Sequence, residues 1–256
     1  MSKKLKIAVL GGSFNPIHIG HLALADEVCI SLHYDKVIFV PSLNSPHKEM
    51  NCALPAKERL KMVKLACKND RRFIVEDCEI LRGGVSYTYQ TLEFLEKKYK
   101  NVLSEKLGLI LGSDLFSGFH LWKNAEEISE KANLILAKRP KESQETENFQ
   151  ISQNSQNPLL NSQNLHLSSQ NSQLSHQNHQ NKALGDYAKL AEQKNSDFNV
   201  KNEPLFKNAI FLENPLIPIS STEIRTRISE GKAFKYLVEN KVFKYIKKKG
   251  FYDSRK

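Results

Sequence analysis

The sequence predicts an α/β domain in which the strands of a parallel sheet alternate with helices, and three observations lead to this fold class. The chain has 256 residues, which is enough for one large domain or for one domain with an insertion. Short apolar runs that are typical of buried strands alternate with longer segments of helical periodicity. A glycine pair, Gly11-Gly12, separates the first expected strand at 6–10 from the first expected helix at 22–28.

The glycine pair opens the stretch 11–21, GGSFNPIHIGH. The order strand, turn, helix start is a common geometry for binding phosphate, because glycines let the backbone approach the ligand and a helix end presents unpaired N–H groups. If the helix begins near Ile19, His18 and His21 lie together at its mouth and can donate hydrogen bonds to phosphoryl oxygens. Helix capping by the histidines is the plain alternative. A zinc site is disfavoured because no carboxylate or cysteine partner accompanies them.

The chain carries a net charge of +10. Much of this excess lies in residues 224–256, which hold eleven Lys and Arg against three Asp and Glu. A basic run is usually a solvated helix face, although it can also focus polyanionic substrates toward a site. Because no aromatic-rich motif accompanies the run, we expect no nucleic-acid partner.

The cysteines Cys29, Cys52, Cys67 and Cys78 show no CxxC spacing, and we expect free thiols rather than a disulfide or a metal site. No apolar run approaches the length of a membrane span, and residues 1–4 lead directly into a strand. We therefore expect a cytoplasmic protein without a membrane partner.

The second strand is expected at 36–42, followed by a loop that carries His47 and Lys48. Loops that follow the strands of an open parallel sheet face the ligand crevice, so these two cations are expected there, with an ordinary polar loop as the alternative. A helix is expected from 54 to about 69, and a third strand from 73 to 80.

The next helix is expected to begin near 88, after the segment 82–88. Ser86 or Thr88 can cap it, and capping is their plain role. The same helix end is also a good seat for a carboxylate.

The fourth strand, 107–114, ends in Gly112-Ser113-Asp114. A carboxylate just beyond a central strand is well placed to accept hydrogen bonds from a ribose diol, although Asp114 can also cap the next helix. Trp122 follows, and as a single aromatic residue it most often belongs to a core. The fifth strand is expected at 132–140.

Residues 141–204 are rich in Asn, Gln and Ser and repeat Ser-Gln-Asn. This composition cannot bury enough apolar surface to offset the entropy of ordering, so we expect a disordered insertion. Only 182–194 has apolar residues at helical spacing. Histidines in such a tract do not by themselves indicate a metal site.

A sixth strand is expected at 209–212, followed by a helix start at 219–225. Ser220 and Glu223 have the spacing of a capping box. The hydroxyls of Ser221 and Thr222, with Arg225 one turn later, also make a second anion site that is able to hold a triphosphate.

Several of these motifs resemble one known family. GGSFNPIHIGH resembles the bacterial nicotinate-nucleotide adenylyltransferases, and the segment 219–225, ISSTEIR, resembles the second signature of their nucleotidyltransferase superfamily. Pro-His-Lys at 46–48, Ser-Tyr-Thr at 86–88, Gly-Ser-Asp at 112–114 and Trp-Lys at 122–123 match further family motifs in order. The chain departs from the pattern at Ser45, where a proline is usual, and at Gln90, where an acidic residue is usual. The resemblance covers about residues 5–140 and 205–252.

The resemblance implies a doubly wound, Rossmann-like parallel sheet with its crevice where the first and fourth strands diverge. One domain would comprise residues 1–140 and 205–256, with 141–204 inserted. The implied reaction transfers AMP from ATP to nicotinate mononucleotide, giving nicotinate adenine dinucleotide and pyrophosphate in NAD biosynthesis. Mg²⁺ would accompany ATP, held mainly by the nucleotide rather than by a protein metal site.

The resemblance also implies the roles of individual residues. Catalysis is assigned to His18, His21 and Arg225. ATP binding is assigned to Gly11, Gly12, Ser13, Phe14, His18, His21, Gly112, Asp114, Ser221, Thr222 and Arg225. Binding of nicotinate mononucleotide is assigned to Asn15, His47, Lys48, Ser86, Tyr87, Thr88 and Trp122, the indole being a natural stacking partner for a cationic pyridinium.

Other functions stay open at this point. The same chemistry can serve nicotinamide mononucleotide or phosphopantetheine as the acceptor, although the motifs at 46–48, 86–88 and Trp122 favour a pyridine nucleotide. A nucleic-acid-binding protein with a vestigial site is the alternative from another class, and steep salt dependence of RNA binding would identify it. The sequence leaves the oligomeric state open.

Overall fold

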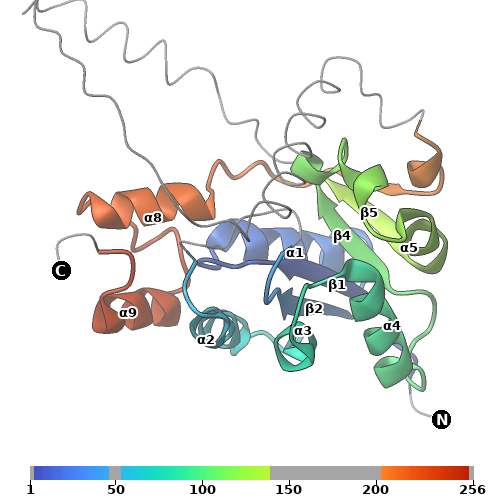
Figure 1. Ribbon diagram of the computed structural model, residues 1–256, viewed down its shortest axis with the longest axis horizontal. Coiled ribbons are helices and arrows are strands. Elements are labelled where there is room, and N and C mark those ends of the chain that lie inside the picture. Colours follow the sequence, from blue (N-terminus) through green and yellow to red (C-terminus); the bar gives the residue numbers. More distant parts are fainter. Residues whose placement is uncertain (1–2, 46–52, 139–202, 254–256) are drawn as a thin grey trace, which may run out of the picture.

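The computed structural model describes residues 3–45, 53–138 and 203–253. Its centre is one six-stranded sheet in the order β3-β2-β1-β4-β5-β6, and every pairing is parallel (Figure 1). The strands are β1 (Ile7–Gly12), β2 (Lys36–Pro41), β3 (Phe73–Val75), β4 (Gly108–Gly112), β5 (Asn133–Ala137) and β6 (Ile210–Leu212). This order is that of a doubly wound Rossmann-like sheet, so the expected fold class is confirmed.

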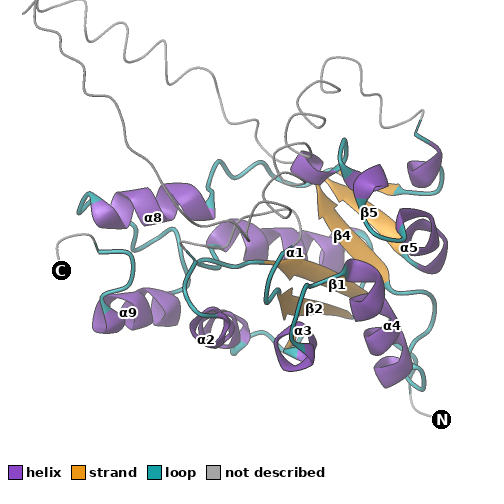
Figure 2. Cartoon of the chain, viewed as in Figure 1, coloured by secondary structure: helices purple, strands orange, loops and turns teal. Residues whose placement is uncertain are grey.

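Helices cover both faces of the sheet (Figure 2). One face carries α1 (Ile19–Ser31), α2 (Ala56–Cys67), α8 (Ser221–Ser229) and α9 (Asn240–Lys249). The other carries α3 (Cys78–Arg82), α4 (Thr88–Tyr99) and α5 (Ala125–Lys131), together with short 3-10 turns, among them η1 (Ser113–Leu115) and η2 (Phe119–Leu121). Because side chains alternate along a strand, β1 sends Leu10 to the first face and Val9 to the second.

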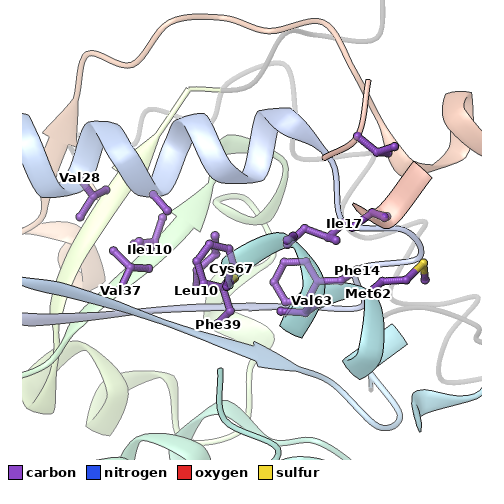
Figure 3. Packing of buried hydrophobic residues seen from close by; sticks show 14 of the residues in the cluster. Leu10, Phe14, Ile17, Val28, Val37, Phe39, Met62, Val63, Cys67 and Ile110 are labelled. Carbon is purple, nitrogen blue, oxygen red and sulfur yellow. The ribbon is translucent and has the colours of Figure 1, made fainter. Parts of the chain in front are cut away.

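The first of these two cores reaches the loop that follows β1. Leu10 and Phe39 on the sheet lie in one buried cluster with Val63 of α2, and Phe14 and Ile17 of the loop join the same cluster (Figure 3). Phe14 and Ile17 are each only 1% exposed. Burying such side chains contributes about 1.5–3 kcal/mol each, so the loop is held to the sheet by its own apolar residues.

The order of the strands reverses between β1 and β4, the two central strands. From β1 the chain proceeds outward to β2 and β3, and from β4 it proceeds outward in the other direction to β5 and β6. β1 pairs with β2 from Ile7 to Gly12, whereas its pairing with β4 extends over Ala8 and Val9. The helix after β1 lies on one face, and the turns after β4 lie on the other. The two loops therefore diverge at the carboxyl ends of these strands, which is where ligands bind in sheets of this kind.

The third strand is shorter than the sequence predicted. β3 ends at Val75, and of the residues expected to extend it to 80, the last three (78–80) lie in α3 instead. The carboxylate of Glu76 is buried and accepts hydrogen bonds from Lys98 at 2.7 Å and from the hydroxyl of Tyr99 at 2.5 Å. Asp77, a residue type favoured at helix starts, then stands at the N-cap of α3. The strand prediction for 76–80 is wrong, because the carboxylate of Glu76 is held by Lys98 and Tyr99 of α4 and the chain turns into α3 directly afterwards.

The structure also bears on the predictions made for the cysteines and for membrane-spanning segments. Cys29, Cys67 and Cys78 are free and buried, as expected, although Cys78 lies in α3 rather than in a strand. Cys52, the loop at 46–48 and the helical spacing at 182–194 lie outside the described residues. Within the described ranges, no helix is both long enough and apolar enough to cross a membrane.

Candidate active site

The loop between β1 and α1 is folded tightly over the end of the sheet. Phe14 has left-handed backbone, with φ of 47°, and its ring lies 5.9 Å from that of Phe39 and 5.1 Å from that of His21. A Cβ atom on Gly12 would lie 3.2 Å from the Phe14 ring, so any larger residue there would crowd that ring. At Gly11, which is exposed, a Cβ would meet nothing within 4 Å. Packing therefore does not explain Gly11, and a glycine at this exposed position leaves room for a ligand to approach the backbone closely.

His18 and His21 lie together at the start of α1, as the sequence predicted. Their ring centroids are 3.7 Å apart, and His18 is the N-cap residue of the helix. The backbone N–H of His18 donates to Nδ1 of His21 at 3.2 Å, so helix capping, the plain alternative, is present as well. A Cβ on Gly20 would lie 3.1 Å from Nδ1 of His18, which explains the glycine within this motif.

The capping contact also fixes the tautomer of His21. Because Nδ1 of His21 accepts a hydrogen bond, the proton of the neutral ring belongs on Nε2. The N–H donor of the ring is then Nε2–H. Such a donor suits a phosphoryl oxygen.

The second anion motif lies directly against the first. The Ser221 hydroxyl donates to the carbonyl of Pro16 at 2.8 Å, and Nη1 of Arg225 donates to the carbonyl of Asn15 at 2.9 Å. Nη2 of Arg225 also donates to the Thr222 hydroxyl at 3.2 Å. The N-terminal ends of α1 and α8 therefore share one loop, and each contributes a positive partial charge.

A capping box comprises two hydrogen bonds, and the one expected at the start of α8 shows the bond from the backbone to the N-cap side chain. Ser220 is the N-cap residue, and its hydroxyl accepts the backbone N–H of Glu223 at 3.1 Å. The Glu223 carboxylate instead accepts from Nε of Arg227 at 2.9 Å. The Ser220 hydroxyl therefore caps α8, whereas the side chains of Ser221 and Arg225 contact the loop after β1.

Asn15 is buried, and its side chain is held by two donors. Its Oδ1 atom accepts the backbone N–H of Leu54 at 3.3 Å and the hydroxyl of Tyr252 at 2.8 Å. These two donors fix the orientation of the carboxamide. Its remaining hydrogen-bonding group is the donor Nδ2.

The start of α4 lies against the loop that follows β2. The hydroxyl of Ser86 accepts the backbone N–H of Leu43 at 3.0 Å, and the backbone N–H of Ser86 donates to the carbonyl of Asn44 at 2.9 Å. The N-cap of α4 is Tyr87, and no side chain caps it. The prediction that Ser86 or Thr88 caps this helix is therefore wrong, because Ser86 joins two loops instead.

The Trp122–Lys123 segment reaches the same helix start. Nζ of Lys123 lies 4.7 Å from the ring centroid of Tyr87, within the range of a cation–π contact. Trp122 is half-buried, and its ring lies 5.2 Å from that of Phe119. The structure thus brings Tyr87, Thr88 and the Trp-Lys pair to one region, on the face opposite α1.

Asp114 lies in η1, directly after β4. It is exposed, and the residue before η1 that serves as its N-cap is Gly112. The alternative in which Asp114 caps the next helix is therefore wrong. Its carboxylate stands at the carboxyl end of the strand next to β1, where acceptors for a ribose diol are expected.

The sequence did not reveal two buried charged residues that support these loops. Arg59 of α2 is 1% exposed and donates to the carbonyls of Ser13, Leu43 and Leu54. Glu79 of α3 is buried and accepts from the Thr91 hydroxyl at 2.7 Å. Burial raises the pKa of Glu79, and hydrogen bonds from Thr91 and Ser86 oppose that shift. For Arg59, the only available signal was a charged residue at a buried position of the amphipathic helix expected at 54–69, whereas Glu79 fell in a stretch expected to be a strand.

Comparison with known proteins places nearly the whole chain in one family. The family model described as cytidylyltransferase-like matches residues 9–227. A "Probable nicotinate-nucleotide adenylyltransferase" of Borreliella afzelii is 33% identical over 248 residues, which is 97% of each chain. A protein of the same description from Clostridium tetani is 34% identical over 247 residues, covering 96% of this chain and 98% of the relative.

Solved structures show the same fold at lower identity. Plasmodium falciparum nicotinic acid mononucleotide adenylyltransferase complexed with NaAD has a TM-score of 0.60 at 16% identity, with 97% of each chain covered. The same enzyme complexed with APC has a TM-score of 0.59 at 15% identity and the same coverage. Family match, relatives and fold agree: the chain belongs to the cytidylyltransferase-like family and, within it, to the nicotinate-nucleotide adenylyltransferases.

Proposed function

We propose that this protein transfers AMP from ATP to nicotinate mononucleotide, forming nicotinate adenine dinucleotide and pyrophosphate. The observation that carries the proposal is the contact between the two anion motifs. Arg225 and Ser221 of α8 hydrogen-bond to the loop that ends in His18 and His21. Donors for one polyphosphate thus gather at the end of β1, beside the point where the sheet changes direction.

The chemistry suits these residues because it needs no general base. The nucleophile is a phosphate monoester, whose second pKa is about 6, so it is largely a dianion at neutral pH. Catalysis then rests on in-line positioning and on stabilising the charge of the leaving pyrophosphate. The Nε2–H of His21, the guanidinium of Arg225 and two helix N-termini supply that stabilisation.

The nucleotide sites follow from the same arrangement. ATP would lie along Gly11, Gly12 and the two histidines, with its ribose at Asp114 and its phosphates toward α8. The full ATP set is Gly11, Gly12, Ser13, Phe14, His18, His21, Gly112, Asp114, Ser221, Thr222 and Arg225. Nicotinate mononucleotide would be bound by Asn15, Ser86, Tyr87, Thr88 and Trp122, and by His47 and Lys48, which lie outside the described residues.

Selection of the acid over the amide is supported by charge at the start of α4. The N-terminus of that helix favours a carboxylate, and the ammonium group of Lys123 lies over the neighbouring Tyr87 ring. A carboxamide carries no charge and gains less from either feature.

Mg²⁺ fits this site as part of the nucleotide substrate. In the described part of the chain, no group of three or more His, Cys, Asp or Glu is arranged to hold a metal ion. Phosphate oxygens and water are the usual ligands of Mg²⁺ in such enzymes, and the ion would neutralise charge on the phosphates.

The test is pyrophosphate release from ATP and Mg²⁺ with one of three acceptors: nicotinate mononucleotide, nicotinamide mononucleotide or phosphopantetheine. A reaction without acceptor measures simple ATP hydrolysis. We expect a clear preference for nicotinate mononucleotide. Preference for either other acceptor would contradict the assigned substrate, and release with none of them would contradict the transferase activity itself.

A further inference from the structure

A contact near the C-terminal end of the described chain reaches into the loop after β1. The hydroxyl of Tyr252 donates to Oδ1 of Asn15 at 2.8 Å, across 237 positions of the sequence. The same oxygen accepts the backbone N–H of Leu54, at the start of the segment that leads into α2. Asn15 therefore receives one donor from the region before α2 and one from the segment after α9.

The backbone around Tyr252 is built to make this contact. Gly250 and Tyr252 both have left-handed backbone, with φ of 61° and 63°, which turns the chain back after α9. That conformation is unfavourable for a tyrosine, and such positions persist where surrounding contacts hold them. The ring of the intervening Phe251 packs against Tyr245 at 5.8 Å. Backbone hydrogen bonds from Gly250 to Lys247 and from Phe251 to Ile246 also hold this turn, so it does not depend on the hydrogen bond to Asn15 alone.

The electrostatic surroundings keep the Tyr252 hydroxyl a donor. Burial raises the pKa of Tyr252, while the nearby guanidinium groups of Arg225 and Arg59 lower it by less. The phenol thus stays protonated across the neutral range. Both arginines also donate to carbonyls of the β1–α1 loop, at Asn15 and Ser13. Tyr252 belongs to the same set of donors around this loop.

We propose that Tyr252 is a positioning residue that orients the Asn15 carboxamide toward nicotinate mononucleotide. With Oδ1 fixed by two donors, Nδ2 is the group turned to the substrate. The inference rests on the proposed function, which assigns Asn15 to the mononucleotide. It goes further in giving the segment after α9 a role in substrate binding.

The test is Tyr252→Phe, which removes only the hydroxyl. Tyr245→Phe is its matched control, because the Tyr245 hydroxyl donates to the carboxylate of Glu58 on α2 instead of to the loop. We expect Tyr252→Phe to raise KM for nicotinate mononucleotide about fivefold, the effect of one hydrogen bond. KM for ATP and the melting temperature should stay within the range of the control.

A double-mutant cycle tests whether the effect passes through Asn15. In an Asn15→Ala background, Tyr252→Phe should weaken binding of nicotinate mononucleotide no further. Binding measured by calorimetry gives this result without any turnover. Equal KM values for Tyr252→Phe and Tyr245→Phe, or full additivity with Asn15→Ala, would overturn the inference. A wild-type protein that binds nicotinate mononucleotide but releases no pyrophosphate would instead contradict the proposed function.

Discussion

Nη1 of Arg59 donates to the main-chain carbonyl of Ser13 at 2.6 Å and joins α2 to the loop that follows β1. The other guanidinium nitrogens donate to Leu43 at 3.2 Å and Leu54 at 3.0 Å. One buried side chain thus fixes the loop after β1, the loop after β2 and the entry to α2. A guanidinium suits this position because its planar set of donors reaches three carbonyls at once.

Replacing Arg59 by Lys is expected to lower both stability and substrate affinity. A single ammonium group reaches fewer of the carbonyls, and each buried acceptor left without a donor costs about 1–3 kcal/mol. We expect a loss of about 2–4 kcal/mol in the free energy of unfolding, measured by urea denaturation. Arg71→Lys, at an exposed position, is the control and should change it by less than about 0.5 kcal/mol. An Arg59→Lys variant as stable as this control would contradict the role.

Removing the imidazole of His21 is expected to abolish most turnover while leaving the fold intact. A preorganised donor to developing charge is worth about 10²–10³ in kcat, so His21→Ala should lose at least that factor with ATP and nicotinate mononucleotide. Circular dichroism checks the fold. His33→Asn is the control, since His33 is exposed with φ of 56°, a conformation that asparagine tolerates. Near-normal turnover in His21→Ala would remove the main support for the proposed site.

The sequence was most informative where a motif is contiguous. Strand periodicity and the spacing of His18 and His21 predicted the first loop and the contact between the two rings. Arg59 and Tyr252 could not be found this way, because the residues that they contact in the first loop, Ser13 and Asn15, lie 46 and 237 positions away in the sequence. The third strand was overextended for a local reason. Apolar residues on both sides of Glu76 resemble a strand, and only the buried partners of that carboxylate show where the strand ends.

Substitutions at two glycines, Gly11 and Gly108, can distinguish a role in ligand binding from a role in packing. A Cβ on Gly11 meets nothing within 4 Å, so Gly11→Ala should keep its stability within about 0.5 kcal/mol and raise KM for ATP. A Cβ on Gly108 would lie 2.7 Å from the Tyr34 hydroxyl, so Gly108→Ala should lose about 1–3 kcal/mol. Its KM for ATP should stay close to wild type. Thermal melts and initial rates on both variants distinguish the two cases, and an unchanged KM in Gly11→Ala would contradict ligand contact there.

Glu79 makes stability depend on pH in a direction that can be predicted. Burial raises the pKa of its carboxyl above the value of 4.5 expected in an unfolded chain. A group of this kind contributes its full stabilisation below the unfolded pKa, and that contribution is lost as pH rises through the folded pKa. The ionised form therefore opposes folding at neutral pH, even though Thr91 donates to it.

Glu79→Gln keeps an acceptor for Thr91 without the charge, and we expect it to be more stable than wild type at pH 7. The advantage should disappear as pH falls below about 4.5, where the wild-type carboxyl is protonated in both states. Urea unfolding from pH 4 to pH 8 measures this difference, with Glu96→Gln at an exposed position of α4 as the baseline for losing one acidic group. A Glu79→Gln variant that is less stable than wild type at pH 7 would mean that Thr91, Ser86 and the nearby arginines stabilise the charged carboxylate more than burial disfavours it.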